Sequence, residues 1–275
     1  MSNKNYSQLA EVKGFAFPVY ASAGVEQQAY HIATRCQRAY HFLRDTLSFP
    51  AEANVLVLST SNWSLYATFP VYGMPHYSDE RTVVIAGENN GFWRSFAPPP
   101  EILLPFVAAA FQAAYGQRDG SIDLTSFFNL LAVHEMAHLF HSQAPAHFPR
   151  KWLMELFCNL GLHAYVVNVE PDQLPALETF PQAIVDLGYA HLPYSTLADF
   201  ERLYANMDGQ NFAWYQSQLH VAAKRIFDNG GLETLQRFWK VFLLPRNNIS
   251  DEQLADLLSQ EVHPEVGRVL IEWAR

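Results

Sequence analysis

The hydrophobic pattern changes along the chain from short apolar runs to long stretches with helical spacing. In the N-terminal third, residues 15–20, 54–59 and 82–86 predict strands, and residues 25–47 carry apolar positions three and four apart. Beyond Leu124 the spacing is almost entirely helical. Further helices are expected at residues 196–206, 212–227, 232–244, 249–260 and 264–274. The pattern predicts a small mixed sheet followed by a helical lobe.

Prolines interrupt this pattern at two places. Residues 98–100 form a Pro-Pro-Pro run, expected as a stiff loop before a helix that starts near Glu101. Residues 170–193 contain four prolines and are expected to be an irregular stretch that crosses between the lobes. We therefore expect one domain over residues 1–275, with a mixed lobe over about 1–145 and a helical lobe over about 146–275.

Composition excludes several classes of protein. Hydrophobic residues make up 49% of the 275 residues and charged residues only 16%, which argues against disorder. The 27 acidic residues outnumber the 18 basic residues, for a formal net charge of −9. Such a surface repels phosphates at long range, so a nucleic-acid partner is not expected.

The ends of the chain and its cysteines indicate a reducing compartment. Residues 1–13 hold no apolar run that resembles a signal-peptide core. The most apolar window, residues 102–115, is too short to span a membrane. Cys36 and Cys158 are too few for a disulfide framework and are expected to be small buried hydrophobes. We expect a cytoplasmic protein without membrane association.

The sharpest chemical signal is the run His134-Glu135-Met136-Ala137-His138. On a helix, residues four apart lie one turn apart on the same face, so both imidazoles can bind one metal ion. Glu135 projects about 100° round the helix and is placed to act as a general base without ligating the metal. This HExxH arrangement is typical of zinc metalloproteases, although the motif alone also arises by chance.

The surroundings of the motif strengthen this interpretation. Residues 124–141 are apolar round most of the helix, which predicts a buried helix. Histidines and a glutamate buried there need partners, and a divalent cation satisfies them. A catalytic zinc needs a third protein ligand. The metzincin spacing is absent, with His141 and Ala144 at its glycine and histidine positions. The downstream carboxylates are Glu155, Glu170 and Glu178, of which Glu155 lies in a second apolar helix where a lone carboxylate needs a partner.

The two segments together resemble the gluzincin metallopeptidases. In that family a second helix supplies a glutamate ligand, within a pattern of proline, tryptophan, leucine, one further residue and the glutamate. Pro149, Trp152, Leu153 and Glu155 follow this pattern, and Leu156 departs from it where glycine is usual. The resemblance implies a thermolysin-like α+β catalytic domain that holds one Zn²⁺ through His134, His138 and Glu155.

The resemblance also implies roles for residues outside the ligand set. An acidic or amide residue four positions after the ligand orients the first histidine in several gluzincins, and Asn159 occupies that position; a solvent-facing polar residue is the alternative. A tyrosine at the start of a later helix that ends at a glycine stabilises the oxyanion, which indicates Tyr215. The alternative is that Tyr215 only anchors the helix by packing. The hydrogen bond to the oxyanion then comes from Tyr189, Tyr194, Tyr204 or His220.

Two further positions follow from the same comparison. His141 shares the helix face of His138 and is expected beside the metal site rather than as a ligand, because three ligands from one straight helix crowd a tetrahedral ion. The family's substrate-pairing edge strand is expected at residues 82–86.

The expected function is zinc-dependent hydrolysis of peptide bonds in a peptide or protein substrate, with Glu135 as general base. Two alternatives remain open. The same zinc site is suited to hydrolysing a non-peptide bond, and a non-catalytic binding protein can retain the fold. The intact Glu135 argues against the second alternative. The sequence does not indicate an oligomeric state.

Overall fold

The computed structural model describes residues 6–88, 91–246 and 248–273. Within these residues the fold is α+β, with eleven α-helices and one five-stranded mixed sheet. The chain divides into two compact units. The first comprises Met1–Ser95 and Leu124–Ala144, and the second comprises Phe96–Asp123 and Pro145–Arg275. The second unit thus includes a stretch, Phe96–Asp123, that the sequence pattern placed with the N-terminal lobe.

The sheet of the first unit has the strand order β1-β2-β3-β5-β4. The central strands β2, β3 and β5 run parallel, with Leu56 opposite both Tyr20 and Val84. The outer strands β1 and β4 are each antiparallel to their neighbour. The bounds are β1 Ala10–Glu11, β2 Val19–Ala21, β3 Asn54–Leu58, β4 His76–Asp79 and β5 Thr82–Ala86.

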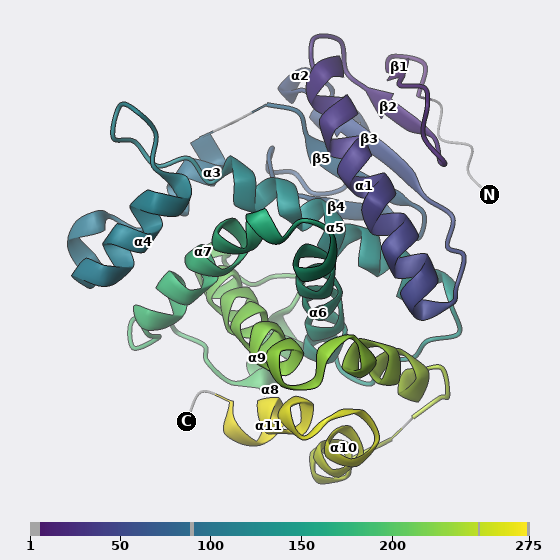
Figure 1. Cartoon of the computed structure of the whole chain (residues 1–275), viewed down its shortest axis with the longest axis vertical. Helices are drawn as coiled ribbons and strands as arrows, with labels where there is room; N and C mark the ends of the chain where they lie inside the picture. The colour runs from purple at the N-terminus through teal and green to yellow at the C-terminus, as the bar shows by residue number, and fades with distance from the viewer. Residues whose placement is uncertain (1–5, 89–90, 247, 274–275) are drawn as a thin grey trace. The chain divides into compact units, whose positions relative to one another are not determined.

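Two long helices pack on this sheet. Helix α1 (Glu26–Leu47) contacts β2 and β3, and helix α5 (Thr125–Gln143) contacts β4 and β5. The two helices also contact each other, and α1 crosses in front of the strands in Figure 1. Short helices α2 (Thr60–Tyr66) and α3 (Gly91–Ser95) complete the unit. Buried apolar residues of β3 and β5 form the core beneath the long helices.

The strand predictions were partly right. The strands predicted at residues 54–59 and 82–86 are confirmed as β3 and β5, whereas the strand expected at residues 15–20 covers only Val19–Ala21. The expectation that residues 82–86 form the edge strand is wrong, because β5 lies between β3 and β4. The edge is β4, whose sequence His-Tyr-Ser-Asp has no apolar alternation that marks a strand.

The second unit is helical. Its first helix, α4 (Pro105–Tyr115), follows the short 3₁₀ turn η1 (Pro100–Ile102). The helices α6 (Lys151–Val169) and α9 (Gly209–Phe242) contact each other extensively, and α7 (Leu174–Asp186) packs against both α4 and α9. The remaining elements are η2 (Pro171–Gln173), α8 (Leu197–Leu203), α10 (Asp251–Leu257), the π-helical η3 (Leu258–Val262) and α11 (Pro264–Glu272).

Helix α7 contradicts the prediction of an irregular crossing segment at residues 170–193. The whole segment lies within the second unit, and Pro175 sits in the first turn of α7, where a missing N–H costs nothing. Pro181 lies inside the helix, and a side chain of α4 bridges the backbone of the turn before it. The Tyr115 hydroxyl donates to the Ala176 carbonyl (2.7 Å) and accepts from the Phe180 N–H (3.1 Å). A hydroxyl inserted into the hydrogen-bond ladder lets the helix accommodate its proline.

Helix α9 joins two stretches that were predicted as separate helices. Asp208 caps its start by accepting from the N–H groups of Gln210 and Asn211. Gly231 breaks the helical backbone with φ 59° and ψ −159°, a conformation that side chains other than glycine rarely adopt. Tyr215 therefore lies in the second turn of a longer helix rather than at a helix start, while the break near Gly230 occurs as expected.

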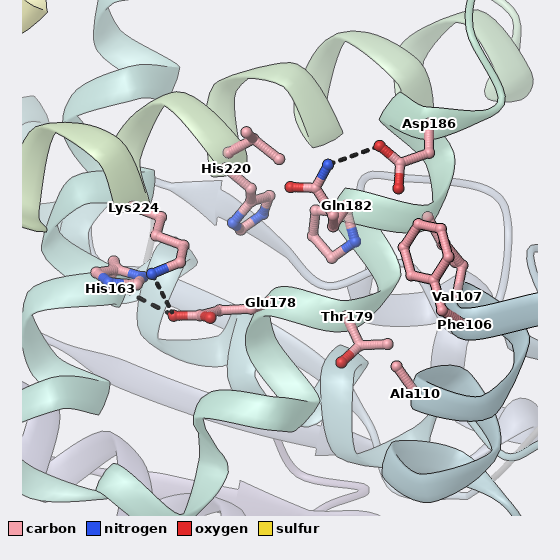
Figure 2. Close-up of a pocket in the computed structure, with 13 residues that line it drawn as sticks. Phe106, Val107, Ala110, His163, Glu178, Thr179, Gln182, Asp186, His220 and Lys224 are labelled. Carbon is pink, nitrogen blue, oxygen red and sulfur yellow. Dashed lines mark hydrogen bonds and ion pairs between the residues drawn. The ribbon is translucent and has the colours of Figure 1, made fainter. Parts of the chain in front are cut away.

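A pocket of about 270 Å³ lies among α4, α6, α7 and α9 in the second unit (Figure 2). Among the described residues, no helix is both long and apolar enough to cross a membrane. Both cysteines are free and fully buried, as predicted.

Candidate metal centre

Helix α5 carries the HEMAH residues at the centre of the first unit. At its N-terminal end Phe128 stacks on Trp93, with ring centroids 5.3 Å apart. At its C-terminal end the Gln143 amide donates to the carbonyls of Glu52 and Glu80 and accepts from the Glu52 N–H. These contacts fix the N-terminal end of the helix to α3 and its C-terminal end to the loops before β3 and after β4. Residues 132–140 are all buried, as the nearly uniform apolar sequence predicted.

The Nε2 atoms of His134 and His138 point toward each other. These atoms lie 3.0 Å apart, and the side chains are only 5% and 2% exposed. Two imidazole ligands on a tetrahedral zinc, each about 2.0–2.1 Å from the ion, place their nitrogens about 3.3 Å apart. The pair therefore fits a shared ion within a few tenths of an ångström. The competing arrangement is a hydrogen bond between two neutral imidazoles.

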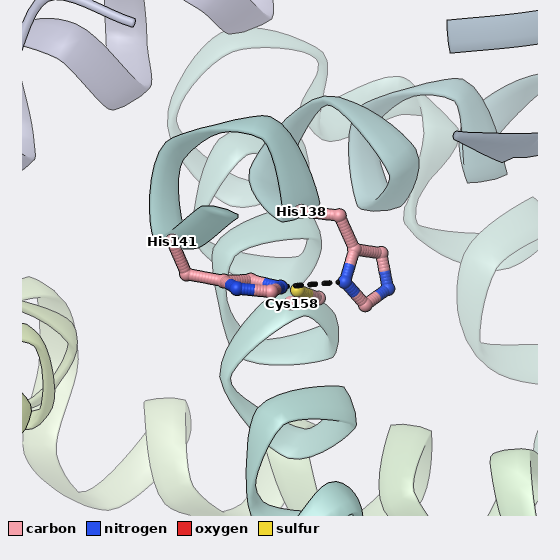
Figure 3. A group of neighbouring side chains, drawn as sticks. All are labelled: His138, His141 and Cys158. Atoms are coloured by element: carbon pink, nitrogen blue, oxygen red, sulfur yellow. Dashed lines mark hydrogen bonds between the residues drawn. The ribbon is translucent and has the colours of Figure 1, made fainter. Parts of the chain in front are cut away.

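The other nitrogen of His138 is held by His141. The Nδ1 atom of His138 lies 2.8 Å from Nε2 of His141, as the dashed line in Figure 3 marks. A metal-bound histidine usually makes such a second hydrogen bond, which fixes its tautomer and ring orientation. On the opposite side, the Tyr77 ring of β4 stacks on His138 with centroids 4.7 Å apart. Sequence reasoning missed Tyr77, because it lies on the unpredicted strand β4.

Glu135 is buried on the same helix between the two histidines in sequence. Its position next to His134 turns its carboxylate about 100° away from the histidine face. A carboxylate there is suited to accept a proton beside a metal ion rather than to ligate the ion.

Glu155 belongs to helix α6 of the second unit and is 2% exposed. Its two oxygens each accept a hydrogen bond, one from the Tyr204 hydroxyl and the other from the Gln216 amide (2.7 Å). The Gln216 carbonyl oxygen in turn accepts from the Asn159 amide (3.2 Å). Asn159, fully buried one turn after Glu155, thus acts on that carboxylate through Gln216. It is not solvent-facing, which removes the alternative of a solvated polar residue.

The N-terminal end of α6 and the C-terminal end of α8 are tied together. Glu201 accepts a hydrogen bond from the backbone N–H of Trp152 (3.0 Å), which satisfies one donor of the first turn of α6. The Lys151 ammonium lies 5.2 Å from the centre of the Tyr204 ring. These contacts bring Tyr204, at the end of α8, to the Glu155 carboxylate.

Tyr215 is placed differently. Its hydroxyl donates to the Thr196 carbonyl (2.7 Å), and its ring stacks on Trp273 with centroids 5.9 Å apart. Burial raises the pKa of Tyr215, so the hydroxyl stays protonated. These contacts anchor α9 to the start of α8 and to the C-terminal segment.

The remaining candidates for an oxyanion donor lie elsewhere in the second unit. Tyr189 packs on Trp214, and the Tyr194 ring lies 5.5 Å from the Arg202 guanidinium. His220 lines the pocket among α4, α6, α7 and α9.

Gln216 is the residue that sequence reasoning overlooked. The available signal was the four-residue spacing of polar positions on the mostly apolar helix α6 and on the amphipathic helix α9. Helix α6 has Glu155, Asn159 and His163 at this spacing, and α9 has a matching series at Gln216, His220 and Lys224. Polar groups in such register on contacting helices predict hydrogen bonds between the helices.

Comparison with known proteins gave no match: no family model, no curated protein sequence and no solved structure is significantly similar to this chain.

Proposed function

We propose that the chain is a gluzincin-type zinc metallopeptidase that hydrolyses peptide bonds. His134 and His138 of the first unit and Glu155 of the second are the proposed ligands of one Zn²⁺. The observation that carries the proposal is the 3.0 Å separation of the two buried Nε2 atoms within an HExxH sequence. The pattern of Trp152, Leu153 and Glu155 on α6 supports the third ligand.

Each neighbouring residue has a separable role in this proposal. His141 holds the ring of His138 through Nδ1, and Tyr204 and Gln216 orient the Glu155 carboxylate. The three proposed ligands would hold a zinc ion, which would supply a water with its pKa lowered toward about 7 and a Lewis acid for a carbonyl oxygen. Glu135 accepts the proton that the attacking water loses and donates it to the leaving amine nitrogen. The products are a carboxylic acid and an amine, so atoms and charge balance.

A hydrogen bond to the substrate carbonyl oxygen is the remaining requirement. The contacts support Tyr204 for this role over Tyr215. The Tyr204 hydroxyl donates its one proton to the carboxylate of the proposed third ligand and would turn that hydrogen bond to a substrate carbonyl bound beside it, whereas the Tyr215 hydroxyl donates to Thr196. We therefore place Tyr204 beside the reacting carbonyl and assign Tyr215 to the packing of the helical unit.

The test is the variant Glu135→Gln, which keeps the size of the side chain and removes its basicity. Zinc content should stay unchanged while kcat for a set of quenched fluorescent peptides falls about 10²–10⁴-fold. Glu233→Gln, which removes an exposed carboxylate paired with Arg237, is the matched control. Equal turnover by Glu135→Gln and the parent would rule out the proposed base.

The same peptides decide what kind of bond is cut. Peptides with free and with blocked termini distinguish exopeptidase from endopeptidase action. If no peptide is cut but simple esters or amides are hydrolysed in a Glu135-dependent way, the zinc hydrolase is not a peptidase. If zinc binds and nothing is hydrolysed, the chain is a binding protein.

A further inference from the structure

The pocket in the helical unit has a polar end and an apolar end. Figure 2 shows His163, Glu178 and Lys224 together at one end, and Phe106, Val107 and Ala110 at the other. The second end is mainly apolar, and the two polar side chains that line it, Gln182 and Asp186, bond to each other (2.8 Å). Its volume of about 270 Å³ is close to the lower limit for small-molecule sites. An amphipathic pocket of this size fits a small ligand with a polar head and an apolar stem.

The polar end carries a surplus of negative charge. The Lys224 ammonium lies 2.7 Å from Asp228 and 3.5 Å from Glu178, so one cation serves two carboxylates and the group has a net charge of −1 (+1 − 2). The closer partner of Lys224 is Asp228, which leaves Glu178 only partly compensated. Burial raises the pKa of the Glu178 carboxyl. This direction is expected for a carboxylate whose charge is only partly compensated by a cation.

His163 adds an unsatisfied polar atom beside this carboxylate. The side chain is 3% exposed, and its Nε2 atom makes no hydrogen bond within the described part of the chain. Nε2 lies 3.9 Å from Glu178, too far for a hydrogen bond. A buried nitrogen without a hydrogen-bond partner lowers the stability of the fold. A ligand group that reaches this nitrogen, after a small shift of the Glu178 side chain, gains a hydrogen bond that the protein alone does not make.

The apolar end is open to solvent at Phe106 and Ala110. Phe106 is 70% exposed although its ring lines the pocket, and Val107, next to it on α4, is buried. An aromatic ring at the mouth gives an alkyl stem a surface to pack on. It also gives a cation a ring face to approach.

We propose that this pocket binds a cation on a short apolar stem, either an alkylammonium or an alkylguanidinium group. The cation donates hydrogen bonds to Glu178 and to the His163 nitrogen, and the stem packs against Phe106 and Val107. Lys224 remains paired with Asp228. An anion is disfavoured, because it meets Glu178 and finds Lys224, the ammonium among the described lining residues, already engaged twice.

The probes are n-butylguanidinium, n-butylammonium, n-butyrate and n-butanol, titrated by calorimetry into the full-length protein. All four share one alkyl stem, so their differences report on the head group. The two cations should bind, and butyrate and butanol should bind at least about tenfold more weakly. Equal binding of butyrate or butanol would overturn the proposal.

Two variants assign the binding to this pocket. Glu178→Gln should weaken n-butylguanidinium binding about tenfold or more, and Phe106→Ala should weaken it severalfold. Glu233→Gln makes the same charge change on an exposed part of α9 and should leave the affinity unchanged. Full affinity in Glu178→Gln would place the cation elsewhere and refute the site. Because Glu178 and Phe106 are partly or largely exposed, both variants should fold.

The cation has two natural sources, a free amine or guanidine and a basic side chain of a peptide. N-acetyl-arginine amide, with both ends blocked, distinguishes them: tighter binding than n-butylguanidinium indicates a peptide, and weaker binding indicates a free small molecule. His163 lies eight residues after Glu155 on α6, about 12 Å along the helix axis. The proposed cation site is therefore separate from the proposed metal ligand. The measurement needs no zinc and no turnover, so its result is independent of the proposed peptidase activity.

Discussion

The Nε2 atoms of His134 and His138 lie 3.0 Å apart, one turn apart on a buried helix. Two imidazoles converge in this way either to share a proton or to share a metal ion. The glutamate between them in sequence and the second hydrogen bond of His138 favour the metal ion. Variants at the neighbouring residues should separate those that would hold the ion from those that stabilise the fold.

His141 should tune zinc affinity without ligating the ion. Its Nε2 lies 2.8 Å from Nδ1 of His138, so His141→Ala frees the imidazole ring to rotate. Loss of such an outer hydrogen bond typically weakens metal binding about 10–100-fold. Competition with a fluorescent zinc chelator measures this. His147→Ala is the control, and a complete loss of zinc in His141→Ala would instead make His141 a ligand.

Tyr204 and Tyr215 should respond differently to removal of the hydroxyl. Tyr204→Phe is expected to lower kcat about 10²–10³-fold, the usual cost of losing an oxyanion donor. Tyr215→Phe removes one hydrogen bond to the Thr196 carbonyl, which keeps its bond from the Phe200 N–H, and should lower the free energy of unfolding by about 0.5–1.5 kcal/mol, with kcat unchanged. Steady-state kinetics and urea denaturation measure the two effects. A fall of kcat in Tyr215→Phe at unchanged stability would restore Tyr215 as the oxyanion donor.

Tyr115 should be essential to helix α7. Its hydroxyl bridges Ala176 and Phe180, one residue before Pro181. Tyr115→Phe leaves a buried carbonyl and a buried N–H unpaired, which is expected to cost about 1–3 kcal/mol of unfolding free energy. Denaturant unfolding measures this, and the double variant Tyr115→Phe/Pro181→Ala is the internal control. Since an alanine in place of Pro181 lets α7 close its own ladder, the cost of Tyr115→Phe should shrink in that background; an undiminished cost would show that the bridge does not serve the proline.

The stability of the protein should fall in acid partly because of His163. Burial lowers its pKa from 6.5 to about 4; nearby Asp228 opposes this shift and Lys224 adds to it. The folded state therefore resists protonation of the ring that the unfolded chain accepts. Stability is retained above pH 6.5 and lost as the pH falls toward 4, by at most on the order of 3 kcal/mol.

His163→Gln removes this titration and is the matched variant. The loss of unfolding free energy between about pH 7 and about pH 4 should be smaller in His163→Gln than in the parent, because the two proteins share every other ionisable group. Equal losses in the two proteins would mean that the imidazole titrates normally in the folded state.

Much of the candidate site was predictable, because it rests on local patterns. Spacing of four residues places His134 and His138 on one face of α5 whatever surrounds the helix, and the apolar residues around them predict burial. The partners of Glu155 depend instead on how α8 and α9 pack against α6. Sequence spacing fixes no such contact, so Gln216 was missed and Tyr204 ranked below Tyr215.

In the fold, too, elements set by the local sequence were predicted, and elements that depend on tertiary contacts were not. The apolar runs of β3 and β5 predicted these strands, whereas β4 is a short polar strand held by its pairing with β5. The error at α7 has a similar cause. Prolines normally interrupt helices, and the tertiary contact by which Tyr115 bridges the turn before Pro181 cannot be read from the sequence.

The zinc content of purified protein, measured by inductively coupled plasma mass spectrometry, tests the proposed metal centre most directly. The parent and Glu135→Gln should each hold about one zinc per chain after dialysis against buffer without free metal. His134→Ala and Glu155→Gln should lose it, and His147→Ala should keep it. A parent without near-stoichiometric zinc, or a Glu155→Gln variant that retains zinc as tightly as the parent, would contradict the proposed ligand set.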